Sequence, residues 1–288
     1  MQLCKVQLAD GQVRIGKVEG AYVHFLPVED GPGARSLSDI LHADDPTTVA
    51  GNFFANCSQS SPVQAVTFLP PVDQQEIWAA GVTYKRSQEA RERESAGAAR
   101  FYDLVYSAPR PELFFKATAN RVVGSGDVVR IRRDCRWSVP EPELALVLSP
   151  RMDIVGYTIG NDMSARDIEG ENPLYLPQAK IYDRSCALGP VVTLAENMPA
   201  LDQVSIRMNI ERRGSRVFEG GTSLRAMNRK LEDLVHWLSL ENSFPHGAVL
   251  LTGTGVVPPD EFTLQNGDLI TIEIAGIGRL VNRVEQQV

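Results

Sequence analysis

The sequence predicts a mainly β or α+β protein. Segments in which apolar and polar residues alternate, as in half-buried strands, begin at residues 3–8 and 13–18 and recur further along the chain. Residues 231–240 form the clearest amphipathic helix, with Leu231, Leu234, Val235 and Leu238 on one face. The chain shows no βαβ period and no internal repeat. Strands therefore dominate the predicted fold, and helices are few.

The first 70 residues are expected to form a small N-terminal α+β domain, and residues 71–288 a larger domain. Asp10-Gly11 lies between the first two predicted strands, where it is a hairpin turn signal. Pro70-Pro71 interrupts the chain at the expected boundary.

Beyond the boundary, apolar runs and alternation predict further strands at residues 76–81, 112–116, 145–148, 154–160, 204–210, 248–252 and 269–274. Residues 87–97 have helix propensity but little apolar stripe, which indicates a solvated flap. Residues 170–180 contain Pro173 and Pro177 and are expected to form a loop that ends at Lys180.

The composition narrows the class of protein. A hydrophobic fraction of 43% over 288 residues is enough to bury a substantial core. The net charge of −7 gives no general attraction for nucleic acid or anionic membranes. The sequence has no apolar stretch of the roughly 20 residues that cross a bilayer, and its N-terminus lacks the apolar core of a signal peptide. We therefore expect a cytoplasmic protein that acts on a small molecule.

The cysteines and histidines are poor candidates for metal ligands. The four cysteines are scattered without a CxxC pair, which is typical of reduced thiols. The four histidines are not paired at metal-binding spacing and are expected to be structural. Any metal is therefore expected to be bound by oxygen.

Three carboxylates could provide that oxygen. Glu141 and Glu143 are two residues apart beside an apolar run, so on a strand they project from the same face. Asp162 follows another predicted strand. Such a set suits Mg²⁺ or Mn²⁺, which prefer hard oxygen ligands. The alternative from spacing alone is a pair of solvated acids at the start of a strand.

Two further features are ambiguous from the residues alone. Lys180 could stabilise an enolate or relay a proton near a metal-bound carbonyl, or it could be an ordinary surface lysine. The turn at residues 251–255 contains Gly253 and Thr254. Its backbone N–H groups could hold a carboxylate, or the segment could be a simple glycine turn.

Taken together, these pieces resemble the fumarylacetoacetate hydrolase superfamily over residues 76–284. The elements that carry the resemblance occur in the family order at residues 111–116, 141–144, 156–167, 188–190, 252–254, 267–268 and 276–282. The resemblance implies that family's mixed β-sandwich roll, assembled as a homodimer or homotetramer. It also implies metal ligands at Glu141, Glu143 and Asp162, an active-site lysine at Lys180, and a substrate-contacting threonine at Thr254.

One departure from the family pattern changes the expected reaction. Hydrolases of this family carry a Tyr-x-x-His segment that activates water, and here Ser87 stands three residues after Tyr84 in place of the histidine. Serine has no accessible pKa near neutrality, so it cannot be that base. Residues 167–180 instead resemble the branch of 2-keto-3-deoxy-pentonate dehydratases, which form 2,5-dioxopentanoate in the breakdown of sugar acids.

We therefore expect a Mg²⁺-dependent dehydratase of a 2-keto-3-deoxy-D-arabinonate or D-xylonate, or of the L-arabinonate epimer. Lys180 and Glu112 are the candidates for proton transfer, although Glu112 could instead be an exposed acid at a strand edge. Besides Thr254 and Gly253, the substrate is expected to contact the side chains of the flap, Arg86, Ser87 and Glu89.

The sequence leaves several assignments with more than one alternative. Arg166 and Asp167 are expected to form an ion pair that fixes the loop of Asp162, and Lys116 is either a salt-bridge partner in the site or a surface residue. The nearest alternative function is a C–C hydrolase or decarboxylase that acts on an acylpyruvate or oxaloacetate. An alternative of another class is a non-catalytic sugar-acid-binding protein.

Overall fold

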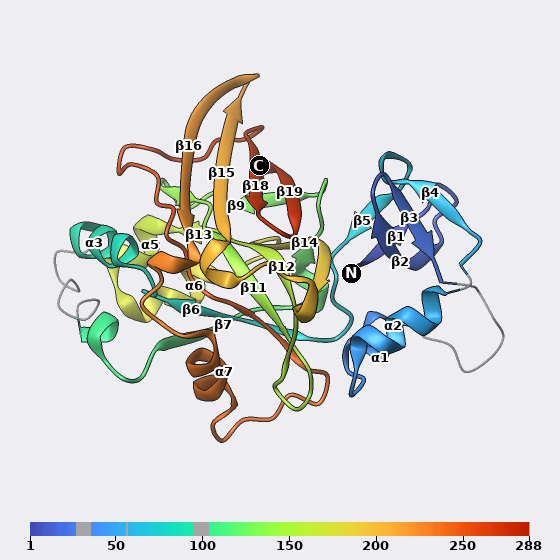
Figure 1. Ribbon diagram of the computed structural model, residues 1–288. Helices are drawn as coiled ribbons and strands as arrows, with labels where there is room; N and C mark the ends of the chain where they lie inside the picture. Colours follow the sequence, from blue (N-terminus) through green and yellow to red (C-terminus); the bar gives the residue numbers. More distant parts are fainter. Residues whose placement is uncertain (27–35, 56, 95–103, 288) are drawn as a thin grey trace.

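The computed structural model describes residues 1–26, 36–55, 57–94 and 104–287 (Figure 1). The described strands are β1 (Gln2–Gln7), β2 (Val13–Glu19), β3 (Tyr22–Phe25), β4 (Ser60–Pro62), β5 (Thr67–Leu69), β6 (Glu76–Gly81), β7 (Glu112–Thr118), β8 (Val122–Val123), β9 (Val128–Ile131), β10 (Ser138–Val139), β11 (Pro142–Leu148), β12 (Ile154–Asp162), β13 (Ser164–Ala165), β14 (Cys186–Leu194), β15 (Ser205–Arg212), β16 (Ser215–Ser223), β17 (Ala248–Leu251), β18 (Leu269–Ile274) and β19 (Gly278–Gln286). The described α-helices are α1 (Leu37–Leu41), α2 (Pro46–Phe54), α3 (Lys85–Glu94), α5 (Arg166–Glu171), α6 (Leu176–Lys180) and α7 (Leu231–Ser239).

A mixed sheet runs through the whole molecule. Its strands follow the order β4-β3-β2-β1-β14-β12-β11-β17-β6-β7, while β5 pairs with β1 and β8 pairs with β14. The strands β1–β5 and the helices α1 and α2 lie together at one side (Figure 1), and β1 joins them to the rest by pairing with β14. The boundary expected near residue 70 falls between β5 and β6.

A second sheet completes the larger part of the fold. Its order is β16-β15-β18-β19-β9, and the inward side chains of β15, β18 and β19 join the main hydrophobic core. Helix α7 begins and ends within a residue of the predicted range, and Leu231, Leu234, Val235 and Leu238 are buried as its apolar face requires. The prediction of a strand-rich fold with few helices is confirmed.

The strands at the centre of the large sheet position the site. Each residue of β11 is buried because β12 and β17 flank it and other elements cover both its faces. This explains the continuous apolar run at its end, which a strand with one solvated face would not have. β11 and β12 pair antiparallel, with Glu143 opposite Gly160. The first residues of β11 therefore lie beside the last residues of β12.

The prediction of a loop at residues 170–180 is wrong. The segment contains the end of α5, a 3₁₀ turn over Pro173–Tyr175 and helix α6. Proline is well tolerated in the first turn of a helix, because the N–H groups of that turn have no acceptor within the helix. Pro173 and Pro177 occupy such positions, and the Asn172 side chain accepts a hydrogen bond from the N–H of Leu174. The prolines therefore start helical turns here.

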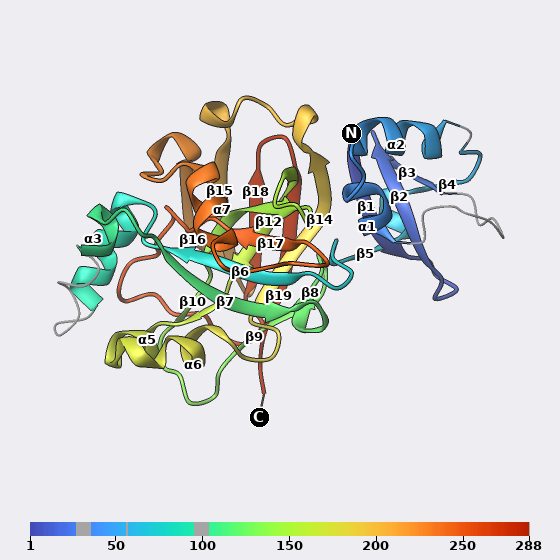
Figure 2. The same ribbon diagram turned by 90° about the horizontal axis from the view of Figure 1, so that it is seen from below.

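Helix α3 confirms the prediction of a polar helical segment near residue 87. Residues 95–97 of the predicted range lie outside the described residues. Figure 2 shows α3, α5 and α6 at the same end of the molecule, and α3 contacts α5. The described residues contain no helix with the length and apolar character that crossing a membrane requires.

Candidate active site

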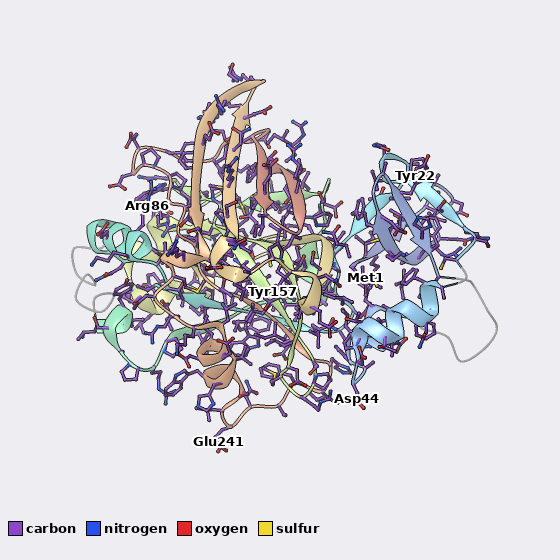
Figure 3. All side chains as sticks on the ribbon, in the orientation of Figure 1. Met1, Tyr22, Asp44, Arg86, Tyr157 and Glu241 are labelled. Atoms are coloured by element: carbon purple, nitrogen blue, oxygen red, sulfur yellow. The ribbon has the colours of Figure 1, made fainter. Side chains whose placement is uncertain are left out.

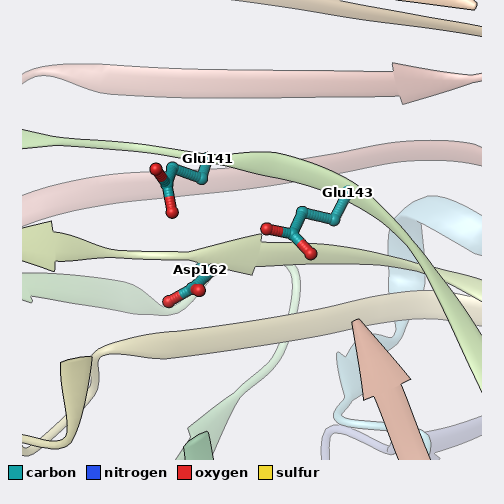
Figure 4. A group of neighbouring side chains, drawn as sticks. All are labelled: Glu141, Glu143 and Asp162. Atoms are coloured by element: carbon teal, nitrogen blue, oxygen red, sulfur yellow. The ribbon is translucent and has the colours of Figure 1, made fainter. Parts of the chain in front are cut away.

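Three buried carboxylates converge where β11 begins and β12 ends. Glu141, Glu143 and Asp162 each offer an oxygen atom, and these atoms lie within 4.8 Å of one another. Figure 4 shows the three side chains pointing toward one another. Their exposed fractions are 3%, 2% and 1%, so none is a solvated surface acid.

The backbone explains why these positions meet. Glu141 and Glu143 are two residues apart in extended backbone and therefore project from the same face. The N–H of Asp162 donates a hydrogen bond of 3.0 Å to the carbonyl of Glu141, which holds the end of β12 against the start of β11. Spacing and strand pairing together produce the cluster.

Lys180 binds the cluster directly from the last turn of α6. Its Nζ donates to Glu141 Oε2, to Asp162 Oδ2 at 3.1 Å and to the hydroxyl of Ser164 at 2.6 Å. Ser164 in turn donates to Glu141 Oε2 at 2.9 Å. Lys180 is only 3% exposed, so the expected alternative of a surface lysine is excluded.

Lys116 holds the opposite side of Asp162. Its ammonium lies 2.5 Å from Asp162 Oδ1 and donates to the carbonyls of Met163 (2.9 Å) and Lys180 (2.5 Å). The side chain is completely buried on β7. Of the two alternatives for Lys116, the salt-bridge partner is therefore the one observed. Through these contacts it fixes both a carboxylate of the cluster and the backbone of Lys180.

The prediction of an ion pair between Arg166 and Asp167 is wrong. Arg166 donates to Glu141 Oε1 at 2.6 Å, and its other terminal nitrogen lies 3.8 Å from Glu169 Oε2. Asp167 instead accepts hydrogen bonds from the thiol of Cys135 and the N–H of Arg136, both at 2.8 Å. Because α5 begins at Arg166, one turn of helix brings Glu169 to the same face and carries Asp167 to another.

The surroundings of Glu143 disfavour its charged form. Burial raises the pKa of Glu143 well above its usual range, and repulsion from Asp162 and Glu141 raises that pKa further. Attraction to Lys180 and a hydrogen bond of 2.6 Å from the N–H of Gly253 act in the opposite direction. The N–H of Gly253 is thus used by a carboxylate of the protein itself.

The donor set fits a hard divalent cation. All three converging groups are carboxylates, as Mg²⁺ and Mn²⁺ prefer. Each carboxylate has about four lone-pair sites, so the hydrogen bonds described above still leave room for a metal. A bound cation would also relieve the repulsion that raises the pKa of Glu143. Glu141, Glu143 and Asp162 are therefore the residues that would hold the metal.

A small cavity opens beside the cluster. It is lined by Ala80, Gly81, Val82, Ser87, Glu112, Phe114, Glu141, Glu143, Asp162, Glu169, Lys180, Gly253 and Thr254. Glu112 is half-buried at the start of β7, and Ser87 is 5% exposed on α3. The structure thus brings both proton-transfer candidates, Lys180 and Glu112, to the same cavity as the acids.

The predicted substrate contacts Arg86, Glu89 and Thr254 stay predictions, and they lie differently relative to the cavity. Arg86 and Glu89 are exposed on α3 and do not line the cavity; Arg86, labelled in Figure 3, donates to the carbonyl of Val257. Thr254 lines the cavity, but its hydroxyl donates to the carbonyl of Pro142 at 3.0 Å and accepts from the N–H of Val256. In this arrangement Thr254 fixes the turn that carries Gly253.

Glu169 and Phe114 are among the residues of the cavity wall that sequence reasoning missed. Glu169 is 5% exposed, and its i, i+3 spacing from Arg166 was the signal that could have placed the pair on one helix face. Phe114 lies under the ammonium of Lys180, which is 5.5 Å from the ring centroid. Such a contact favours a charged amine, but nothing in the sequence relates Phe114 to a residue on α6.

Buried oxygen ligands, two buried lysines and a small adjoining cavity define a metal-dependent enzyme that acts on a small molecule. Comparison with known proteins gives the family. Residues 76–285 match the family model described as "Fumarylacetoacetate (FAA) hydrolase C-terminal". The chain belongs to the fumarylacetoacetate hydrolase family.

Individual relatives share most of the chain. It is 51% identical over 214 residues to the "Probable 2-keto-3-deoxyxylonate dehydratase" of Haloferax volcanii, covering 74% of this chain and 73% of the relative. It is 39% identical over 242 residues to the "2-dehydro-3-deoxy-D-arabinonate dehydratase" of Saccharolobus solfataricus, covering 83% and 81%.

A solved structure is similar over the full length. The "2-keto-3-deoxy-D-arabinonate dehydratase complexed with magnesium and 2,5-dioxopentanoate" matches with a TM-score of 0.82 and 32% identity, covering 100% of this chain and 99% of that one. The fold and the family expected from the sequence are confirmed.

Proposed function

We propose that the protein is a Mg²⁺-dependent dehydratase of a 2-keto-3-deoxy-pentonate and forms 2,5-dioxopentanoate in the breakdown of a pentose. The observation that carries the proposal is the joint placement of a buried triple-carboxylate cluster, Lys180 and Glu112 around one cavity. The named activities of the relatives and the ligands of the solved structure support the same reaction. Ser87 also supports it, because a serine cannot activate water as the histidine of C–C hydrolases does.

Glu141, Glu143 and Asp162 hold the metal in this proposal. When bound, Mg²⁺ polarises the 2-oxo group of the substrate and so acidifies the protons on C3. The protein residues around the cluster hold two of these ligands in place: Arg166 pairs with Glu141, and Lys116 pairs with Asp162. Removal of either cation would leave a buried carboxylate poorly compensated.

Lys180 and Glu112 have different roles in the proposed reaction: Lys180 stabilises charge, and Glu112 transfers the proton. The three N–H bonds of the Lys180 ammonium already point to Glu141, Asp162 and Ser164, so the charged side chain is a donor. It stabilises negative charge that develops on the substrate next to the cluster. Glu112 then takes a proton from C3, and the resulting carboxyl group returns it to the departing 4-hydroxyl as water. Subsequent proton shifts convert the C5 alcohol to the aldehyde.

A substrate panel tests this function. Purified protein with Mg²⁺ is incubated separately with the D and L forms of 2-keto-3-deoxy-pentonate, with an acylpyruvate and with oxaloacetate. We expect an aldehyde product from a keto-deoxy acid and no turnover of the other two. Pyruvate from the acylpyruvate, without dehydration of either pentonate, would support the hydrolase alternative and contradict the proposal. Absence of turnover with every substrate would support the binding-protein alternative.

A pair of asparagine variants links the activity to the cluster. Asp162→Asn should abolish turnover, while the same change at Asp153, whose side chain is 60% exposed, should leave it unchanged. An active Asp162→Asn variant would contradict the metal assignment. A homodimer or homotetramer remains the expectation from the family resemblance, and a cytoplasmic location the expectation from the scattered cysteines.

A further inference from the structure

The end of β6 has an unusual relation to Glu112. Gly81 pairs with Glu112 in the antiparallel β6–β7 ladder, and both residues line the cavity beside the carboxylate cluster. The carboxylate carbon of Glu112 lies 2.6 Å from the position that a Cβ on residue 81 would take, and Glu112 Oε2 lies closer still. The Glu112 carboxylate therefore occupies the space left by the missing side chain.

The backbone does not by itself require glycine at this position. Gly81 lies in a regular strand and is not among the glycines with positive φ. Replacement of glycine by alanine in compatible backbone normally stabilises a protein through the unfolded state. The three heavy atoms nearest to this Cβ position all belong to the Glu112 side chain. The glycine at position 81 therefore points to a role in function and not in stability.

We propose that Gly81 is a positioning residue that lets the Glu112 carboxylate lie across the strand end and face the cavity. A side chain at position 81 would push the carboxylate out of that space. Since the far end of a glutamate moves easily, the protein would adapt with little loss of stability, but the acid would be misplaced. This inference rests on the proposed function, in which Glu112 transfers the proton.

The first test is Gly81→Ala in the full-length enzyme loaded with Mg²⁺. We expect kcat to fall about 100-fold, the size of effect that a displacement of about 1 Å can cause. KM and the Mg²⁺ concentration for half-maximal binding, measured by calorimetry, should stay within about threefold, as expected when only a proton-transfer group moves. The melting temperature should be equal or higher. Wild-type kcat would overturn the proposal.

Gly51→Ala is the matched control. Gly51 lies in α2, and a Cβ there would meet nothing within 4 Å. We expect this variant to melt at an equal or higher temperature and to keep wild-type kcat and KM. If it lost as much kcat as Gly81→Ala, the glycine at position 81 would have no special relation to the site, and the proposal would fail.

A double-mutant cycle separates positioning from structure. If Gly81 acts only through Glu112, Gly81→Ala should cause no further loss of kcat in a Glu112→Ala background. An equal further loss in that background would overturn the proposal. Should Gly81→Ala fail to fold, the double variant, which lacks the colliding carboxylate, should fold again; a double variant that also fails would refute the clash.

The same double-mutant cycle separates a failure of the proton-transfer role of Glu112 from a failure of the positioning role of Gly81. Wild-type activity of Glu112→Ala would refute the proton-transfer role in the proposed function. A strongly impaired Glu112→Ala with a fully active Gly81→Ala would refute the positioning role alone.

Discussion

Replacement of Glu143 by glutamine should stabilise the metal-free protein at high pH and destroy its response to Mg²⁺. Glutamine keeps an acceptor for the N–H of Gly253 but carries no charge, so it removes the repulsion with Glu141 and Asp162. At 4.8 Å and an effective dielectric constant of about 20, each like-charge pair costs about 3 kcal/mol. Attraction between Glu143 and Lys180 acts in the opposite direction, and an attraction of about the same size would offset one of the two pairs. The net gain is therefore about 3 kcal/mol.

The direction of the pH dependence follows from the raised pKa of Glu143. A folded-state pKa above the ordinary value of 4.5 means that the folded protein binds this proton more tightly than the unfolded chain. That contribution to stability is fully present below pH 4.5 and is lost as the pH rises through the raised pKa. The advantage of Glu143→Gln is therefore expected to be small at about pH 5 and to grow with pH.

Differential scanning calorimetry of metal-free protein at about pH 5 and pH 8.5 measures this difference. We expect Glu143→Gln to raise the melting temperature by ~6–12 °C at the higher pH, from about 3 kcal/mol and 2–4 °C per kcal/mol. Saturating Mg²⁺ should stabilise the wild type but not the variant. Glu261→Gln, a change at an exposed glutamate, is the control. An equal shift at both pH values would refute the reasoning.

Three further variants test other parts of the account. Lys180→Met should lower kcat by roughly 100-fold or more while Mg²⁺ still binds in calorimetry; near-normal turnover would remove its catalytic role. Lys116→Met removes the shorter of the two lysine contacts to the buried Asp162 carboxylate and one donor to each of the carbonyls of Met163 and Lys180. We therefore expect a loss of about 3–5 kcal/mol in the free energy of unfolding by urea titration, and an unchanged midpoint would contradict it. Leu234→Ala, in the buried face of α7, should cost about 2–5 kcal/mol in the same assay but leave KM unchanged; a changed KM would show that α7 affects the site.

The strands and the metal cluster were accessible from the sequence for physical reasons. A strand repeats every two residues, so alternation located β1 and β2, and the spacing of Glu141 and Glu143 placed them on one face. The order of the family motifs then joined Asp162 and Lys180 to them. Each of these inferences needs only local periodicity or a motif with a characteristic order.

Features that depend on how distant segments meet were less accessible. The helical turns at residues 173–180 were missed because proline marks both loops and helix starts, and only the capping contact of Asn172 separates the two. Arg166 pairs with Glu141 and not with its sequence neighbour, because the start of α5 turns its side chain toward β11. The sequence does not reveal which face of α3 is buried, so it could not show that Ser87 lines the cavity while Arg86 and Glu89 are exposed.

The most direct test of the central claim is the identity of the product formed with and without Mg²⁺. Proton nuclear magnetic resonance can follow purified enzyme acting on 2-keto-3-deoxy-pentonate in deuterated water. A metal-dependent dehydratase predicts the aldehyde signal of 2,5-dioxopentanoate, deuterium in its methylene groups, and no reaction after the metal is removed. Formation of pyruvate and glycolaldehyde, or an aldehyde product at the same rate without metal, would contradict the account.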